Sequence, residues 1–361
     1  MAVTAQAGIF SFGGQSAKGT VASTFYQHRA ADIDLATVSD DRLGPPEVGG
    51  LPTPTIPYRA GVLATGGATI NPRLENTFGW LLHGAVGSWS ATTDENVFGT
   101  ATTNMYNHEF VFATQAGYVP WMSFRKHIPG AAADGSEDLG EIFLDSKIIA
   151  LTIALPNDGL ISTRVDVLGR ESEFVEDPSW TYGNTQMEDW DSIPIGCVTG
   201  GFLQVPSGTE LPVVQATVTL TNAPLDIRQE KVFGSPYIED VTIVGRSLTV
   251  DMLVKWEDPD LYQSIITGST TGTQWTAAPF TSDLDIYAVS TLDAPTTNPA
   301  TPWQLRVRAS EVMYQQVGGI RLAGNNALMQ RITGTAIAST QEYVTINLGN
   351  TVNSTAYTWP T

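Results

Sequence analysis

Residues 147–168 read KIIALTIALPNDGLISTRVDVL and contain two apolar runs on either side of a short polar segment. That segment, PNDG at 156–159, consists of residues that favour tight turns. Its flanks are rich in β-branched residues, and the second flank alternates apolar with polar side chains. We therefore predict paired antiparallel strands over 147–155 and 160–168.

The second half of the chain shows the same alternation. Apolar residues at 216, 218 and 220 alternate with Gln and Thr, and a similar run extends over 248–256. Each pattern is typical of a strand with one buried face. With 34 Gly, 21 Pro and only 15% charged residues, the composition describes a folded, turn-rich protein, which we predict to be mainly β.

Three pairs of short segments recur at a nearly constant spacing, which is half the length of the chain. GWLLHGAVGS begins at Gly79, and DLYQSIITGS begins at Asp260. A Pro-Trp pair recurs at Trp121 and Trp303, and alternating apolar residues recur at 163–167 and 344–348. This order predicts a tandem duplication in which each copy has one short helix ending at a glycine.

The repeat and the chain length together predict two domains. A chain of 361 residues exceeds the usual domain size of about 150 residues. We expect tandem β domains at 1–170 and 201–361, joined by a linker at 171–200. The part of this linker over 171–191 carries seven carboxylates and four aromatic residues.

The sequence has few features of an exported or membrane protein. Cys197 is the one cysteine, so no intrachain disulfide can form, and folding in a reducing cytosol is expected. The first residues lack the charged and apolar regions of a signal peptide, and no run of about 18 apolar residues is present. We expect no membrane insertion.

Loops and titratable residues offer few motifs for enzyme chemistry. GGQSAKGT at 13–20 is a poor phosphate-binding loop because its lysine precedes the glycine, and a flexible turn explains the glycines. The four histidines lack metal-ligand spacing: His28, His83, His108 and His127. We expect His83 to be an interfacial or partly buried helix residue and His108 to be a strand residue.

Carboxylates in the linker offer a weak alternative. Glu188, Asp189 and Asp191 surround Trp190, an arrangement that could suggest glycoside cleavage by a pair of acidic groups. Carboxylates this close together on a linker are normally solvated, and no Gly-x-Ser-x-Gly motif is present. We therefore predict a protein that is not an enzyme, with no catalytic residues, cofactor or metal.

Three stretches together resemble the tail tube proteins of siphovirus-type bacteriophages, in their duplicated form. They are GGQSAKGT at 13–20, the segment 72–88, and GRSLTVDMLVKWEDPDLY at 245–262. The likeness spans nearly the whole chain. It implies two tandem β-sandwich or barrel-like domains, each flanked by a short helix, whose inner strands join neighbouring subunits into a barrel around a lumen.

The resemblance also implies an assembly. Single-domain members form six-membered rings, so a duplicated chain is expected to form a trimeric ring with pseudo-sixfold symmetry, although the sequence leaves trimer and hexamer open. Rings would stack into the tail of a virion assembled in the host cytoplasm. Expected partners are the chain itself and the tape-measure, tail terminator and tail-tip proteins, while double-stranded DNA passes through the lumen without specific binding.

A segment rich in proline and glycine at 40–59 reads as a long irregular loop. In similar proteins a long loop and the terminal segments reach into the adjacent ring, so we assign ring stacking to this loop and to both chain ends. The candidate stacking residues are Asp40, Asp41, Pro45, Pro46, Pro52, Pro54, Pro57 and Arg59.

The charge of the chain suits a conduit. Its 37 acidic and 18 basic residues give a net charge of −19, which disfavours gripping of nucleic acid, and three chains would carry 3 × −19 = −57. Asp166, Asp251 and Asp285 lie on the polar phase of predicted strands and are the candidate lumen-facing residues. The alternative is that they face solvent outside the tube.

Two other readings remain open. Nine tryptophans and the aromatic, acidic linker suit a carbohydrate-binding or adhesive β module that stacks on sugars. Against this, Trp121 and Trp303 occupy matching points of the repeat, which predicts core packing. A capsid or sheath component would share the β-rich composition and self-assembly.

Overall fold

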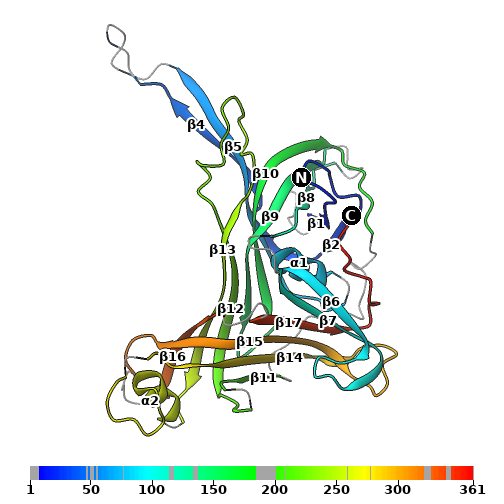
Figure 1. Ribbon diagram of the computed structural model, residues 1–361. Helices are drawn as coiled ribbons and strands as arrows, with labels where there is room; N and C mark the ends of the chain where they lie inside the picture. Colours follow the sequence, from blue (N-terminus) through cyan, green and yellow to red (C-terminus); the bar gives the residue numbers. More distant parts are fainter. Residues whose placement is uncertain are drawn as a thin grey trace.

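The computed structural model describes residues 8–45, 48, 53, 56–75, 77–113, 118–132, 137–183, 201–206, 208–257, 259–276, 278–320, 327–338 and 343–360. Within these ranges seventeen strands are connected in one antiparallel sheet, with two short helices (Figure 1). No helix of the described part is long and apolar enough to cross a membrane. The prediction of a mainly β protein is confirmed.

The elements before residue 184 are β1 (Ile9–Gly14), β2 (Tyr26–His28), β3 (Ala30–Ile33), β4 (Ala36–Leu43), β5 (Pro57–Ile70), α1 (Phe78–Val86), β6 (Gly87–Glu95), β7 (Ala101–Phe112), β8 (Met122–Ile128), β9 (Leu139–Leu155) and β10 (Ser162–Glu176). Those after residue 200 are β11 (Gly201–Gln204), β12 (Val213–Pro224), β13 (Ile243–Lys255), α2 (Asp260–Thr267), β14 (Thr281–Asp293), β15 (Pro302–Gln316), β16 (Met329–Ala336) and β17 (Val344–Asn350).

The predicted hairpin at 147–168 is confirmed and forms the middle of the sheet. β10 pairs with β9 from Ser162 opposite Ala154 to Glu176 opposite Leu139, so both strands are longer than expected. Gly159 has a φ of +101° in the turn, a conformation that favours glycine. The other edge of β9 pairs with β8 in its first half and with β12 in its second half.

A row of long strands runs through both halves of the chain. Its order is β4-β5-β10-β9-β12-β13-β16-β15, and each neighbouring pair is antiparallel. One face of this row is apolar and packs into the main core. In Figure 1 β9, β10, β12 and β13 stand upright, β14, β15 and β17 cross their lower end, and the β4–β5 hairpin projects from the upper end.

The expected division into two tandem domains is not confirmed. Strands from the two halves pair directly, β9 with β12 and β7 with β17. One cluster of buried apolar side chains extends from Phe10 to Tyr357. Because the halves share one sheet and one core, the described residues show no separate cores at 1–170 and 201–361. The linker at 171–200 falls partly outside the described residues, and β10 extends into it as far as Glu176.

A repeated strand order is nevertheless present. β4-β5-β10-β9 and β12-β13-β16-β15 are two groups of four strands, and a helix follows the second strand of each group, α1 after β5 and α2 after β13. Both helices end at glycines with positive φ, Gly87 at 84° and Gly268 at 77°, as the Gly-Ser endings predict. The helices differ in burial, because every residue of α1 is buried, whereas most residues of α2 are half-buried or exposed.

The constant half-chain spacing does not hold beyond the helices. β6 and β7 lie between α1 and β8, whereas α2 leads directly into β14. As a result, 163–167 lies in β10, which pairs with β9 and β5, and 344–348 lies in β17, which pairs with β15 and β7. These segments do not occupy matching positions. Trp303 is buried in β15, while Trp121 precedes β8 and is half-buried.

Candidate assembly arm and threonine face

A two-stranded ribbon projects from the body of the protein (Figure 1). It consists of β4, 36–43, and the first part of β5, 57–63, and we call it the arm. β5 pairs with β10 only from Ala64 onward, so the arm extends beyond the rest of the sheet. The expectation of an irregular loop over 40–59 is therefore wrong at both ends, because residues 40–43 and 57–59 are paired strands.

The candidate stacking residues divide accordingly. Asp40, Asp41, Pro57 and Arg59 lie in the arm, and Pro45 lies just after β4. The remaining candidates, Pro46, Pro52 and Pro54, lie outside the described residues.

The arm exposes apolar side chains. Leu43 is 63% exposed, Tyr58 49% and Val38 49%, and Ile56 beside the arm is 60% exposed. Isolated two-stranded hairpins are at best marginally stable in water. An exposed apolar ribbon of this kind is typical of a segment that packs against another molecule.

The charges of the arm are paired within it. Arg42 Nη2 lies 2.7 Å from Asp40, and Arg59 Nε lies 2.7 Å from Asp41. Hydrogen bonds from these arginines lower the pKa of both aspartates. Exposed ion pairs contribute little to stability. Because these charges cancel in pairs, the exposed apolar side chains dominate the surface of the arm.

The base of the arm is supported by residues 225–242, which connect β12 to β13 and which we call the 225–242 connection. Val62 N donates to the carbonyl of Pro236 at 2.9 Å, and Lys231 Nζ donates to the carbonyl of Ala60 at 3.1 Å. These bonds provide partners for backbone N–H and C=O groups in the part of β5 that does not pair with β10. The direction of the arm thus depends on a segment from the other half of the chain.

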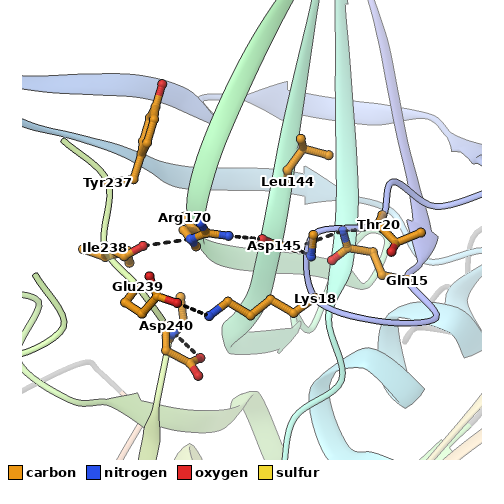
Figure 2. A network of polar contacts seen from close by, with 12 residues as sticks. Gln15, Lys18, Thr20, Leu144, Asp145, Arg170, Tyr237, Ile238, Glu239 and Asp240 are labelled. Atoms are coloured by element: carbon orange, nitrogen blue, oxygen red, sulfur yellow. Dashed lines mark hydrogen bonds and ion pairs between the residues drawn. The ribbon is translucent and has the colours of Figure 1, made fainter. Parts of the chain in front are cut away.

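A buried polar network fixes this connection to the first half (Figure 2). Asp145 is 1% exposed and accepts hydrogen bonds from Gly19 N at 2.6 Å and Arg170 Nη1 at 2.6 Å. Arg170 Nε then donates to the carbonyl of Ile238 at 2.9 Å. Asp145 has a φ of +45°, so the backbone is strained where it presents this carboxylate.

The same network explains the glycine-rich segment at 13–20. Gly13 and Gly14 belong to β1, and the following turn is held by Asp145 through Gly19 N and Gln15 Nε2. The amide that would face a phosphate faces the chain's own carboxylate. Its lysine, Lys18, contacts Glu239 at 3.1 Å. The segment therefore has a structural role as a turn that ties the N-terminal strand to the network.

We expect Asp145→Asn to destabilise the protein by about 3 kcal/mol, because it leaves Arg170 without its buried carboxylate partner. Asparagine tolerates positive φ, so the backbone itself should be accommodated. The measurement is the free energy of unfolding in urea. Glu239→Gln is the control, because its exposed ion pair should contribute less than about 1 kcal/mol. Equal effects of the two substitutions would show that the network does not act as described.

The polar face of the long-strand row is rich in threonine. One register row across β5, β10, β9, β12, β13 and β16 consists of Thr69, Arg164, Thr152, Thr219, Thr249 and Thr335. Thr217, Thr221 and Thr333 lie on the same face in neighbouring rows. We call these residues the threonine face. They are half-buried or exposed, while the opposite face carries core residues such as Val218 and Val250.

The two arginines on the threonine face are paired with aspartates. Arg164 lies 2.7 Å from Asp34 and 2.8 Å from Asp166, and Arg331 lies 2.5 Å from Asp251. The hydrogen bond from Arg164 lowers the pKa of Asp34. Two arginines against three aspartates leave one net negative charge in this group. The face is polar and wettable but offers no strong excess of either charge.

Two of the three candidate lumen residues lie on this face. Asp166 and Asp251 have the predicted polar orientation, and the structure brings both together with threonines from neighbouring strands. Asp285 does not: it is 2% exposed, and Arg306 donates to its two oxygens at 2.9 and 2.6 Å. The prediction that Asp285 lies on the open polar face of its strand, as a candidate lumen residue, is wrong, because β14 is covered on both faces at this point and the carboxylate is satisfied internally.

Two buried histidines hold the C-terminal residues 351–360. His83 Nδ1 donates to the carbonyl of Tyr357 at 2.8 Å. Trp89 Nε1 donates to Nδ1 of His108, so His108 Nε2 carries the proton and donates to the carbonyl of Val352 at 3.0 Å. Burial lowers the pKa of each histidine to about 4.

The sequence prediction for these histidines was partly right. His108 is a strand residue in β7 as predicted, and His83 lies in α1 but is buried. Their shared contact with the C-terminal segment was missed, since the partners lie at the opposite end of the chain. The aromatic residues Tyr357 and Trp359 are the one feature of the sequence that indicates burial of the C-terminal segment in the core.

The described residues contain no group of three or more His, Cys, Asp or Glu that could hold a metal. The acidic residues considered for glycoside cleavage, Glu188, Asp189 and Asp191, lie outside the described residues with Trp190 and Cys197. Of the tryptophans in the described part, only Trp275 is exposed, at 75%. These ranges therefore show no row of exposed tryptophans on which sugar rings could stack.

Comparisons with protein-family models and with curated proteins found no match.

Proposed function

We propose that this protein is a tail tube protein of a long-tailed, siphovirus-type bacteriophage, which assembles into stacked rings around a channel for DNA. The observation that carries the proposal is the threonine face. A DNA conduit has to be wetted by water without holding the DNA, and the electrostatic affinity of proteins for the phosphate backbone comes mainly from lysine and arginine. Here the arginines of the face are already paired with aspartates.

Lateral contacts between copies would close the sheet into a barrel. Among the described strands, one edge of β4 has no strand partner, and neither does one edge of β14 over 281–284. Open edges of this kind are covered or used in native proteins. Side-by-side pairing of copies through these edges would surround a lumen lined by the threonine face.

The repeated order of strands favours a trimeric ring. Each chain would contribute two groups of four long strands, so three chains would present six similar units with pseudo-sixfold symmetry. The arm then lies at one end of the ring, where its apolar side chains would contact the next ring. A contact between different surfaces of successive copies propagates as an open filament.

The wider role follows from the same proposal. The tube would belong to the tail of the virion and would be built in the host cytoplasm. Tape-measure, tail terminator and tail-tip proteins would be its partners, and double-stranded DNA would pass through without specific binding. The net charge of −19 per chain, or −57 for three, supports passage rather than retention of DNA.

Negative-stain electron microscopy of the purified, concentrated chain tests the proposal. We expect rings or hollow tubes whose end-on averages show threefold symmetry with six similar lobes. Solid fibres without a lumen would contradict it. A monomer that persists at high concentration and binds oligosaccharides on an array would favour a carbohydrate-binding or adhesive module instead.

A further inference from the structure

Apolar side chains of α2 and of the loop that follows it are exposed at the end of the long strands opposite the arm. Ile266 is 43% exposed and Trp275 is 75% exposed. Gln263 Nε2 donates to the carbonyl of Gly272 at 2.6 Å, so the loop folds back against the helix and holds Trp275 beside it. We call Ile266 and Trp275, with the half-buried Tyr262, the α2 surface.

The corresponding helix of the first group of strands is covered by aromatic side chains. α1 follows β5 as α2 follows β13. The ring centroid of Trp80 in α1 lies 6.1 Å from that of Tyr357 and 5.8 Å from that of Trp359, both in the C-terminal residues 351–360. β6 and β7, which also pack on α1, have no equivalent after α2. The α2 surface is therefore the position of the repeat that the chain leaves open.

The arm has the position and the length to reach the α2 surface of a copy stacked beyond it. The arm and α2 lie at opposite ends of the upright strands and on the same side of them (Figure 1). At the usual rise per residue, 57–63 extends about 20 Å, and β13, which leads to α2, spans about 40 Å. The arm would thus overlap only the nearer half of the next copy, which is the half that carries α2.

Net charge favours the arm over the other projection at the same end of the molecule. Residues 256–276, which contain the α2 surface, include three acidic residues and no basic one. The 225–242 connection has four acidic and two basic residues, so it would meet this surface with like charge. The arm has two acidic and two basic residues, which pair with one another. An apolar ribbon without net charge is therefore the better partner for an apolar surface bordered by carboxylates.

We propose that the far end of the arm, with Leu43 and Tyr58, packs against Ile266 and Trp275 on the α2 surface of the next copy along the tube. This inference rests on the proposed assembly into stacked rings and names the surface that receives the arm. The two surfaces belong to different parts of the chain, so the contact is heterologous and repeats from ring to ring. Tyr58 and Trp275 are its aromatic anchors, since aromatic side chains dominate the binding energy of most interfaces.

Substitution of Trp275 tests the α2 surface. Trp275→Ala is expected to raise the critical concentration for tube formation about 30-fold, the effect of removing an aromatic anchor from an interface. Phe174→Ala is the matched control and should not change it, because Phe174 is 58% exposed in β10, outside both surfaces. Both side chains are exposed, so each variant should keep the wild-type melting temperature. Equal critical concentrations for Trp275→Ala and the wild type would overturn the inference.

A double-mutant cycle tests whether the two surfaces meet. Tyr58→Ala alone should raise the critical concentration about tenfold. Tyr58→Ala combined with Trp275→Ala should raise it little further than Trp275→Ala alone, because each substitution removes the same contact. If the two effects multiply instead, the arm and the α2 surface act independently, and the inference is wrong.

Disulfide cross-linking tests the location. In a Cys197→Ser background, Leu43→Cys combined with Gln274→Cys should form intermolecular disulfides on oxidation and give a ladder of oligomers on non-reducing gels, whereas either cysteine alone can give no more than dimers. Leu43→Cys with Val232→Cys, on the 225–242 connection, should give no ladder.

The outcomes separate this inference from the proposed function. Wild-type tubes without a ladder from the first pair, or with a ladder from the second pair alone, would overturn the contact and leave the proposed function standing. Absence of both tubes and ladder at the highest soluble concentration would overturn both.

Discussion

Lowering the pH of the solution into the acid range is expected to remove about 10 kcal/mol of the protein's free energy of unfolding. His28, His83 and His108 are buried, and burial lowers the pKa of each from 6.5 to about 4. One pKa unit corresponds to about 1.4 kcal/mol, so each histidine contributes about 3 kcal/mol.

The sign follows from the proton balance. Between these pKa values the unfolded chain binds protons on the histidines while the folded chain does not, so acid favours unfolding. The contribution is fully present above pH 6.5, decreases as the pH falls, and is lost at about pH 4, where the folded state also binds the protons. Protonation of His108 would in addition put a hydrogen on Nδ1, the atom that accepts the hydrogen bond from Trp89 Nε1, so that two N–H groups would face each other.

Urea unfolding between about pH 7 and about pH 4.5 provides the measurement, and one histidine variant provides the control. In His83→Asn the amide can still donate to the carbonyl of Tyr357, but one titrating group is removed. The slope of stability against pH should then decrease by about one proton, or one third of the expected total. A stability that is constant across this pH range would show that the histidines are not buried in the neutral form.

Deleting residues 44–56, which connect the two strands of the arm and belong to the predicted stacking loop at 40–59, is expected to abolish the stacking of rings. Replacing residues 44–56 with Asn-Gly joins Leu43 to Pro57, which face each other across the arm, through a two-residue turn that suits a hairpin. The arm would still form, but without the segment proposed to reach the next ring. We expect single rings on electron micrographs and no tubes, at concentrations where the wild type is fully assembled.

A second variant separates the apolar surface of the arm from its length. Leu43→Asp with Tyr58→Ser replaces two exposed apolar side chains and should leave monomer stability within about 0.5 kcal/mol. It should reduce assembly at least tenfold, whereas Leu292→Asn, a change of another exposed leucine, should not. Tubes formed by the shortened chain at the wild-type concentration would contradict the role of residues 44–56, and undiminished assembly of the Leu43→Asp, Tyr58→Ser variant would contradict the role of the arm.

Parts of the assembly surface were recognisable in the sequence, but their form was not. The proline- and glycine-rich composition indicated that 40–59 is a distinct segment, but it did not reveal the strands at both of its ends. Exposed strands of mixed polarity lack the alternation of apolar and polar residues that identifies a half-buried strand. The 225–242 connection gave no signal at all. Its importance comes from contacts with β5 and with the network around Asp145, which lie far away in the chain.

The repeat illustrates a different limit. The two helices and their terminal glycines were located correctly, half a chain length apart. The later segments at that spacing do not match, because β6 and β7 are present after α1 and have no equivalent after α2. Alternating apolar residues are common to most strands, so a coincidence of pattern cannot show which strand of one half corresponds to which strand of the other.

Several local features of this protein could be predicted from its residues alone: its β-rich character, the turn at 156–159 and the glycine-terminated helices. These depend on residues within one turn or one strand of each other, so the chain encodes them directly. Other features depend on how distant parts of the chain pack: the two halves share one core, Asp251 lies on the threonine face, and Asp285 is buried under Arg306. Both aspartates alternate with apolar neighbours in the same way, and their burial is set by strands that pair with them from distant parts of the chain.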